Sequence, residues 1–190
     1  ATAGKELLQL PGHGSPIMSA VFSSDGKLLV TASFDQTARV WDAVSGRPLR
    51  VYRGHTAGIV SLAVSPDNKR FATIASDNAV KLWDATQDQE ARSFLEEAYS
   101  LAFDPRSDQL AVGAGGLRVW DLARWRGTHH LNLFRNRLDD RDIYRVAYST
   151  DGRRMISVVE AEKGNLEVRI RDADDEKPRV LAITDWAARD

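Results

Sequence analysis

Cysteine is absent from the 190 residues, and methionine occurs only twice. Without cysteine the chain forms no disulfide and no thiolate metal site, and its composition suits a reducing compartment, so we expect it in the cytoplasm. Neither sign of charge is in excess, because 26 basic residues oppose 27 acidic residues and the formal net charge is −1. This balance argues against nucleic acid or an anionic membrane as a partner, unless a local patch forms.

Long apolar runs and familiar catalytic motifs are missing as well. No segment approaches the roughly 18 apolar residues of a membrane-spanning helix, and residues 1–10 lack the basic start and apolar stretch of a signal peptide. The sequence contains no phosphate-binding loop, nucleophile elbow or HExxH motif. It is 43% hydrophobic and 28% charged, a composition typical of a globular protein.

A repeat of about 40 residues organises the chain. Three markers recur at constant spacing: a Gly-His pair, a Trp-Asp pair whose Trp follows that His by 28 residues, and an aspartate six residues before the Trp. In two units these markers are Gly12-His13, Asp35 and Trp41-Asp42, then Gly54-His55, Asp77 and Trp83-Asp84. A third Trp-Asp pair is Trp120-Asp121. A period of this length indicates stacked structural units.

Each unit reads as short strands separated by turns. Four apolar segments can be superimposed on one another: IMSAVF at 17–22, IVSLAV at 59–64, AYSLAF at 98–103 and IYRVAY at 143–148. A turn sequence such as SSDGK at 23–27 follows each of them, then two more strands. A weaker fourth strand precedes each new unit, the first being ELLQL near the N-terminus.

Four strands alone cannot bury both faces of their sheet, so the units must stack on one another. Radial stacking of four-stranded sheets makes a β-propeller. We therefore predict an all-β fold, a propeller segment of about four four-stranded antiparallel blades. The predicted units span about 5–49, 50–92, 93–130 and 131–183, with 184–190 as a tail or the start of a degenerate repeat.

With these markers the chain resembles the WD-repeat β-propeller family from about residue 5 to about residue 183. In that family a His, a Ser or Thr, an Asp and a Trp form a buried hydrogen-bonded network. The resemblance implies such a network at His13, Ser33, Asp35 and Trp41, and at His55, Asp77 and Trp83, where Ala75 replaces the Ser. We expect these residues to be structural, because a catalytic residue would not recur in every blade.

Departures from the family pattern increase along the chain. In the third unit Phe94 falls at the His position, GAGG at 113–116 shortens the Asp turn, and only Trp120-Asp121 remains. In the fourth, Asp139 falls at the His position and Arg171-Asp172 replaces Trp-Asp. The resemblance also implies six to eight blades, so we expect part of a longer array, or a half ring that pairs with a second copy.

The resemblance places one register of the first strands on the top rim of the propeller, where partners of the family usually dock. The residues expected there are Pro16, Met18, Phe34, Val60, Tyr99 and Tyr144. An alternative is that these side chains fill the channel or cover neighbouring blades. We expect a non-catalytic scaffold or sensor that binds a protein or peptide, without cofactor or metal.

The alternative function is a propeller enzyme with an active site in the central channel. It would need acidic or His residues at channel positions of several blades, where the sequence has Ser19, Ser61, Ser100 and Arg145. Two weaker candidates are the basic aromatic insertion with Arg124, Trp125, Arg126, His129 and His130, and the acidic DADDEK segment at 172–177. Both are expected to be exposed loops.

Overall fold

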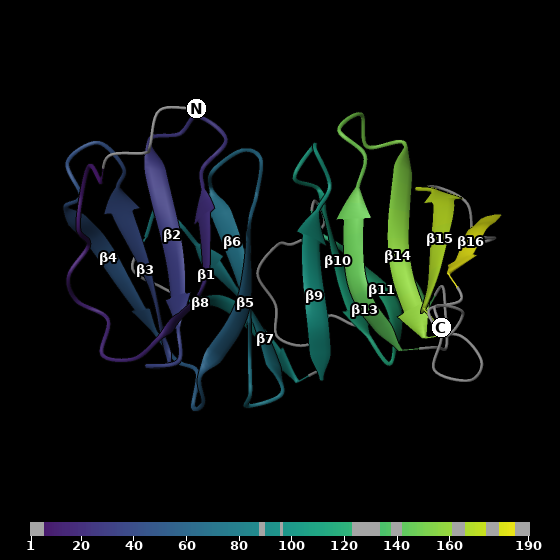
Figure 1. Cartoon of the computed structure of the whole chain (residues 1–190), viewed down its shortest axis with the longest axis horizontal. Helices are drawn as coiled ribbons and strands as arrows, with labels where there is room; N and C mark the ends of the chain where they lie inside the picture. Colours follow the sequence, from purple (N-terminus) through teal and green to yellow (C-terminus); the bar gives the residue numbers. More distant parts are fainter. Residues whose placement is uncertain are drawn as a thin grey trace, which may run out of the picture.

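The computed structural model describes residues 6–87, 90–95, 97–122, 134–137, 142–160, 166–173 and 179–184. These residues form four antiparallel four-stranded sheets and no helix, so the described part of the chain offers no helix that could cross a membrane. Within each sheet the strands pair in chain order. We call the sheets blades 1 to 4, and they follow one another across the molecule (Figure 1). The predicted all-β partial propeller is confirmed.

The strands of each blade are short. Blade 1 comprises β1 (Ile17–Phe22), β2 (Leu28–Ser33), β3 (Thr37–Asp42) and β4 (Pro48–Arg53). Blade 2 comprises β5 (Ile59–Val64), β6 (Arg70–Ala75), β7 (Ala79–Asp84) and β8 (Glu90–Leu95). Blade 3 comprises β9 (Ala98–Phe103), β10 (Gln109–Ala114), β11 (Gly116–Asp121) and β12 (Phe134–Arg137). Blade 4 comprises β13 (Ile143–Tyr148), β14 (Arg154–Glu160), β15 (Leu166–Asp172) and β16 (Arg179–Thr184).

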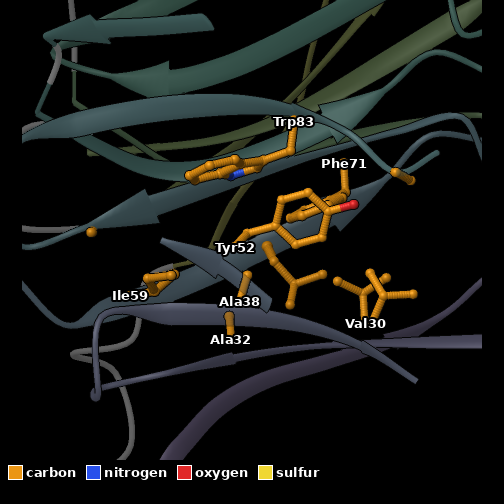
Figure 2. Close-up of a cluster of buried hydrophobic side chains, with 11 residues drawn as sticks. Val30, Ala32, Ala38, Tyr52, Ile59, Phe71 and Trp83 are labelled. Atoms are coloured by element: carbon orange, nitrogen blue, oxygen red, sulfur yellow. The ribbon is translucent and has the colours of Figure 1, made fainter. Parts of the chain in front are cut away.

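The hydrophobic core lies between consecutive blades. Between blades 1 and 2, Tyr52 of β4 has its ring centroid 4.8 Å from that of Phe71 and 5.5 Å from that of Trp83. Val30 and Ala38 of blade 1 pack into the same cluster (Figure 2). Because each large apolar side chain removed from water stabilises the fold by about 1.5–3 kcal/mol, the blades depend on their neighbours.

The two outermost blade faces are not covered by the described residues. Ile17 begins β1 and is 47% exposed, whereas Ile59 and Ile143 at the same position of their blades are fully buried. At the other end Ile156 of β14 is 39% exposed, whereas its counterpart Val30 is 2% exposed. Apolar positions that a neighbouring blade covers elsewhere therefore face solvent at both ends of the row.

The expected strand ELLQL does not form in this structure. Residues 6–10 have no strand pairing, and Leu7 and Leu8 are 86% and 43% exposed. Leu8 and Leu10 instead lie against Gly46 in the turn between β3 and β4. An outer strand needs the third strand of a blade as its partner, and the described residues place no such strand in front of blade 1.

Turns at one end of the blades join neighbouring blades to each other. The backbone N–H of Ser24 donates to Oδ1 of Asn68 at 2.8 Å, and the backbone N–H of Asp67 donates to Oγ of Ser107 at 3.1 Å. Asn68 and Ser107 both have positive φ, at 59° and 64°. These turns connect the first two strands of blades 1, 2 and 3, so the SSDGK-like sequences position the blades as well as reversing the chain.

Candidate functional site

A closed polar network lies inside blade 1. Nδ1 of His13 is 2.8 Å from Oδ2 of Asp35, and Nε2 of His13 is 2.8 Å from Oγ1 of Thr31. Nε1 of Trp41 donates to the same Thr31 oxygen at 2.8 Å. Since the carboxylate only accepts, His13 donates to it from Nδ1, and Nε2 of the neutral imidazole then accepts the Thr31 proton while the indole donates to the Thr31 oxygen. Each of these donors and acceptors is satisfied.

Blade 2 repeats this arrangement. Nδ1 of His55 is 2.9 Å from Oδ2 of Asp77, Nε2 is 2.7 Å from Oγ1 of Thr73, and Nε1 of Trp83 donates to Thr73 at 2.8 Å. The hydroxyl at the centre of each network is therefore Thr31 or Thr73. The expectation that placed Ser33 there, with Ala75 as its replacement in blade 2, is wrong.

Ser33 has a different role, because its hydroxyl bonds backbone groups. Its Oγ donates to the Ser15 carbonyl at 2.9 Å and accepts the Asp35 N–H at 3.0 Å. These contacts shape the loop before β1 and the turn after β2. The side chain that meets Trp41 comes instead from Thr31, because Leu29 lies opposite Trp41 in the β2–β3 pairing and Thr31 points to the same face.

The carboxylates of these networks are held in their ionised form. Burial alone would raise the pKa of Asp35, but hydrogen bonds from Thr37, Gly14 and His13 outweigh it and hold the pKa well below its usual range. The pKa of Asp77 is lowered in the same way by hydrogen bonds from Thr56 and His55, against the effect of burial. Both aspartates thus act as fixed acceptors.

The aspartates of the first two Trp-Asp pairs end their strands, Asp42 in β3 and Asp84 in β7, and each closes the turn that follows. Oδ1 of Asp42 accepts the backbone N–H of Ser45 at 2.7 Å, and Oδ1 of Asp84 accepts the N–H of Thr86 at 2.7 Å. Hydrogen bonds from the Ser45 backbone and side chain lower the pKa of Asp42. The arrangement is that of a turn rather than of a reactive carboxylate.

Blades 3 and 4 are built without the His–Thr–Trp arrangement. Phe94 does not stand in for a histidine: it lies in β8 at the position of Tyr52, and its ring stacks on Trp120 at 4.3 Å with an interplanar angle of 11°. Val112 occupies the place of Thr31, and the buried Arg171 occupies the place of Trp41. Asp139, predicted at the His position of blade 4, lies outside the described residues.

Every blade has a β-bulge at the second residue of its inner strand. In blade 1 the β1–β2 register shifts between Ile17 and Ser19, which leaves Met18 without an opposite residue. The same shift occurs at Val60, Tyr99 and Tyr144. These four side chains are between 37% and 49% exposed, and a bulge is a device that redirects a side chain away from the sheet.

The bulged residues lie beside a second row of loop residues. The N–H at the β2–β3 turn donates to the carbonyl before β1, from Phe34 to Pro16 at 2.9 Å, and in blade 4 Glu160 donates to Asp142 at 3.1 Å. We define the rim as three positions per blade: the residue before the inner strand, the bulged residue, and the residue that ends or directly follows the second strand. The rim comprises Pro16, Met18 and Phe34; Gly58, Val60 and Ser76; Glu97, Tyr99 and Gly115; Asp142, Tyr144 and Glu160.

Side chains of the rim also reach across blade boundaries. The Phe34 ring lies so close to Gly58 that a side chain there would be 2.5 Å from it, yet the ring is 52% exposed. Tyr99 and Tyr144 lie with ring centroids 5.8 Å apart and planes at 41°. The predicted rim residues thus lie at one end of neighbouring blades. They make two separate contacts there, one between Phe34 and Gly58 and one between Tyr99 and Tyr144.

The comparisons with known proteins agree with this geometry. The model of the WD domain, G-beta repeat, matches residues 4–42 and 46–84. Residues 4–42 and 46–84 are therefore two WD repeats. Repeats of this family generally act as non-catalytic interaction scaffolds. The matched residues cover blades 1 and 2, where the His–Thr–Trp network is complete.

Several curated proteins share short segments with this chain. Ribosome assembly protein 4 of Chaetomium thermophilum is 51% identical over 41 residues, which are 21% of this chain and 8% of that protein. Vegetative incompatibility protein HET-E-1 of Podospora anserina is 46% identical over 37 residues, 20% and 3% of the two chains. Periodic tryptophan protein 2 homolog of Schizosaccharomyces pombe is 45% identical over 42 residues, 22% and 5%. The chain spans less than a tenth of each relative.

Some candidates remain untested, and some residues were missed. Within the described ranges no three potential metal-ligating side chains come together. The insertion with Arg124, Trp125, Arg126, His129 and His130 lies outside the described residues, as does most of the acidic segment at 172–177. The sequence reading missed Thr31 and Thr73, and it also missed the rim carboxylates, although aligning the residue before each inner strand would have revealed Glu97 and Asp142.

Proposed function

We propose that this WD-repeat chain is a non-catalytic interaction module that holds a protein or peptide on its rim. The partner would contact Pro16, Met18, Phe34, Val60, Tyr99 and Tyr144. The observation that carries the proposal is the bulge repeated in all four inner strands, because it exposes one large side chain per blade at the same position. Met and Tyr are enriched in the cores of protein interfaces, and Tyr is enriched among binding hot spots.

The buried networks of blades 1 and 2 would support this surface without contacting the partner. His13 lies in the loop that leads to Pro16, and its side chain is only 4% exposed. Asp35 directly follows Phe34 and is hydrogen-bonded to His13. The network would therefore fix both loops of the blade 1 rim, so that a ligand meets an ordered surface rather than having to order it.

A displayed library of random peptides tests the proposal. Peptides selected on the wild-type chain are measured again on Phe34→Ser/Tyr99→Ser and on Val44→Ser, which changes an apolar residue that is 82% exposed in the turn between β3 and β4. We expect at least about a tenfold loss of affinity on the rim variant, since interface hot spots cost roughly 2 kcal/mol or more, and no loss on the control. Peptides that bind both variants as well as wild type would refute rim binding.

The two outermost blade faces expose apolar side chains that a neighbouring blade would bury. We infer that further blades cover them, either from the remainder of a longer propeller or from a second copy of this chain, because identical positions are buried wherever a blade adjoins. A light-scattering mass near the 21.1 kDa of one chain, together with a cooperative unfolding transition, would contradict pairing of two copies. From composition alone, we place the module in the cytoplasm.

A further inference from the structure

The rim has two chemically different halves. Its six positions in blades 1 and 2 carry no charge, and Met18, Phe34 and Val60 supply apolar side chains there. In blades 3 and 4 three of the six positions are carboxylates: Glu97, Asp142 and Glu160, all exposed. The other large side chains in that half are the two tyrosines. The difference lies at equivalent positions, so it reflects side-chain choice on an unchanged backbone framework.

The tyrosine pair lies among these carboxylates. The hydroxyl of Tyr144 donates to Oε2 of Glu160 at 2.8 Å, and this bond raises the pKa of Tyr144. The Glu97 carboxylate, then burial and the Asp142 carboxylate, raise the pKa of Tyr99. The Asp142 carboxylate therefore contributes to the raised pKa of both tyrosines. The negative charge is concentrated around two aromatic faces that are still 40% and 38% exposed.

Described basic residues leave this charge uncompensated. No ion pair joins Glu97, Asp142 or Glu160 to a lysine or arginine of the described ranges. Arg145 follows Tyr144 in β13, but it occupies the register position of Ser19, Ser61 and Ser100, on the other side of the bulge. Because the three carboxylates and both tyrosine rings are themselves exposed, a partner cation could contact both kinds of group.

We propose that the tyrosine pair and its three carboxylates bind an arginine or lysine side chain of the partner protein, while an apolar side chain of the same segment contacts the blade 1–2 half. This inference deepens the proposed function and rests on it. A cation over an exposed ring gains about 0.5–1 kcal/mol, and hydrogen bonds to carboxylates add to that, so the aromatic and acidic groups act together. Guanidinium groups fit best, because they stack on rings and pair with carboxylates in the same plane.

Nuclear magnetic resonance titrations with three synthetic pentapeptides test this inference. The peptides are Gly-Ser-Arg-Ser-Gly, the same peptide with glutamine in place of arginine, and one with leucine there. We expect the arginine peptide to shift the ring signals of Tyr99 and Tyr144 saturably and to bind at least about threefold more tightly than the glutamine peptide at low salt. Equal binding of these two peptides would overturn the inference.

Two double variants, each of which removes two negative charges, test whether the rim carboxylates bind the arginine peptide. Glu97→Gln/Glu160→Gln should weaken arginine-peptide binding about threefold or more, whereas Glu6→Gln/Asp108→Asn removes the same charge from exposed positions outside the rim and should leave binding unchanged. Wild-type affinity in the rim variant would contradict the inference. Should that variant unfold, the comparison of arginine and glutamine peptides on the wild-type chain still decides.

The leucine peptide separates this inference from the proposed function. Shifts of Met18 and Val60 methyl signals by the leucine peptide, without preference for arginine at the tyrosines, would remove the inference and leave the rim as an interaction surface. If no pentapeptide and no library peptide shifts any rim signal, the proposed function fails together with the inference.

Discussion

Blades 1 and 2 differ from blades 3 and 4 although all four have the same strand order and the same bulge. The first pair contains a His–Thr–Trp network in which Thr73, for example, bonds both His55 and Trp83. In the second pair Val112 takes the place of the threonine in blade 3, and Arg171 takes the place of the tryptophan in blade 4, where Arg169 also pairs with Glu167 at 2.7 Å. A blade therefore needs its periodic apolar faces, whereas the polar network is one of several ways to fill its centre.

The two pairs of blades also differ in the charge of their rim positions. Rim positions are uncharged where the network is intact, and acidic where it has been replaced. The short connection between β8 and β9 determines the place of one of these acidic residues. Only two residues separate Leu95 from Ala98, against five between Arg53 and Ile59, so the Gly-His segment has no room in blade 3 and Glu97 stands directly before the inner strand.

The largest effect should follow from removing a network tryptophan. Trp83→Ala is expected to destabilise the fold by about 3–5 kcal/mol, because it empties a site packed against Tyr52 and Phe71 and leaves the Thr73 hydroxyl without its indole donor. Trp120→Ala should cost less, because Val112 offers no hydroxyl to be orphaned. Denaturant unfolding measures both values. An equal or larger cost for Trp120→Ala would contradict the distinction between the two pairs of blades.

The next largest loss of stability should follow from removing the hydroxyl oxygen of Thr73. Thr73→Val keeps the shape but leaves Nε1 of Trp83 and Nε2 of His55 without their partner, at about 1–3 kcal/mol for each unpaired group. The reverse change, Val112→Thr, should give no gain, because Val112 is fully buried in a blade without the histidine. Thermal unfolding of both variants checks this. Stabilisation by Val112→Thr would show that blade 3 retains a hidden partner.

A smaller effect distinguishes two glycines at blade contacts. A Cβ at Gly113 would lie 2.8 Å from the backbone oxygen of Ile143, which cannot move without separating blades 3 and 4. We expect Gly113→Ala to cost about 1–3 kcal/mol. At Gly58 the atoms nearest to a Cβ belong to the half-exposed Phe34 ring, which can turn aside, so Gly58→Ala should cost less than about 1 kcal/mol. Comparable unfolding free energies for the two variants would contradict the tight contact at Gly113.

The smallest expected effect is a change in how the stability of the fold depends on acidic pH. The folded pKa of Asp35 and of Asp77 lies below the ordinary value near 3.8, so their stabilising effect is complete above that pH and is lost as the pH falls below it. We expect Asp77→Asn to be less stable at pH 7 but to lose less further stability below about pH 4 than wild type. Asp108→Asn, an exposed control, should follow the wild-type curve. An identical acid dependence in Asp77→Asn would contradict the role of this carboxylate.

Much of the fold could be predicted from the sequence because the apolar segments repeat with their turns. IMSAVF, IVSLAV, AYSLAF and IYRVAY became β1, β5, β9 and β13 with the expected bounds. The outer strand expected at ELLQL was wrong, since strand pairing depends on a partner that the local pattern cannot supply. Phe94 was misplaced because it was counted back from the next strand, across a connection that is three residues shorter in blade 3.

The site was only partly predictable. Histidine, aspartate and tryptophan are visible as markers, but the hydroxyl that joins them is found only in three dimensions, where Trp41 donates to Thr31 while Ser33 bonds the backbone. No glycine or proline marks the bulges at Met18 and its counterparts, so their exposure required the three-dimensional pairing. The acidic half of the rim becomes visible only when blades are compared position by position.

We propose that the bulged rim binds the partner, whereas the buried network stabilises the fold. Saturation mutagenesis with two readouts, folded abundance and binding of library-selected peptides, tests it most directly. We expect changes at Met18, Val60, Tyr99 and Tyr144 to lower binding at nearly wild-type abundance, and changes at Thr73 and Trp83 to lower abundance and binding in proportion. Rim changes that reduce abundance as strongly as network changes, or leave peptide binding intact, would contradict it.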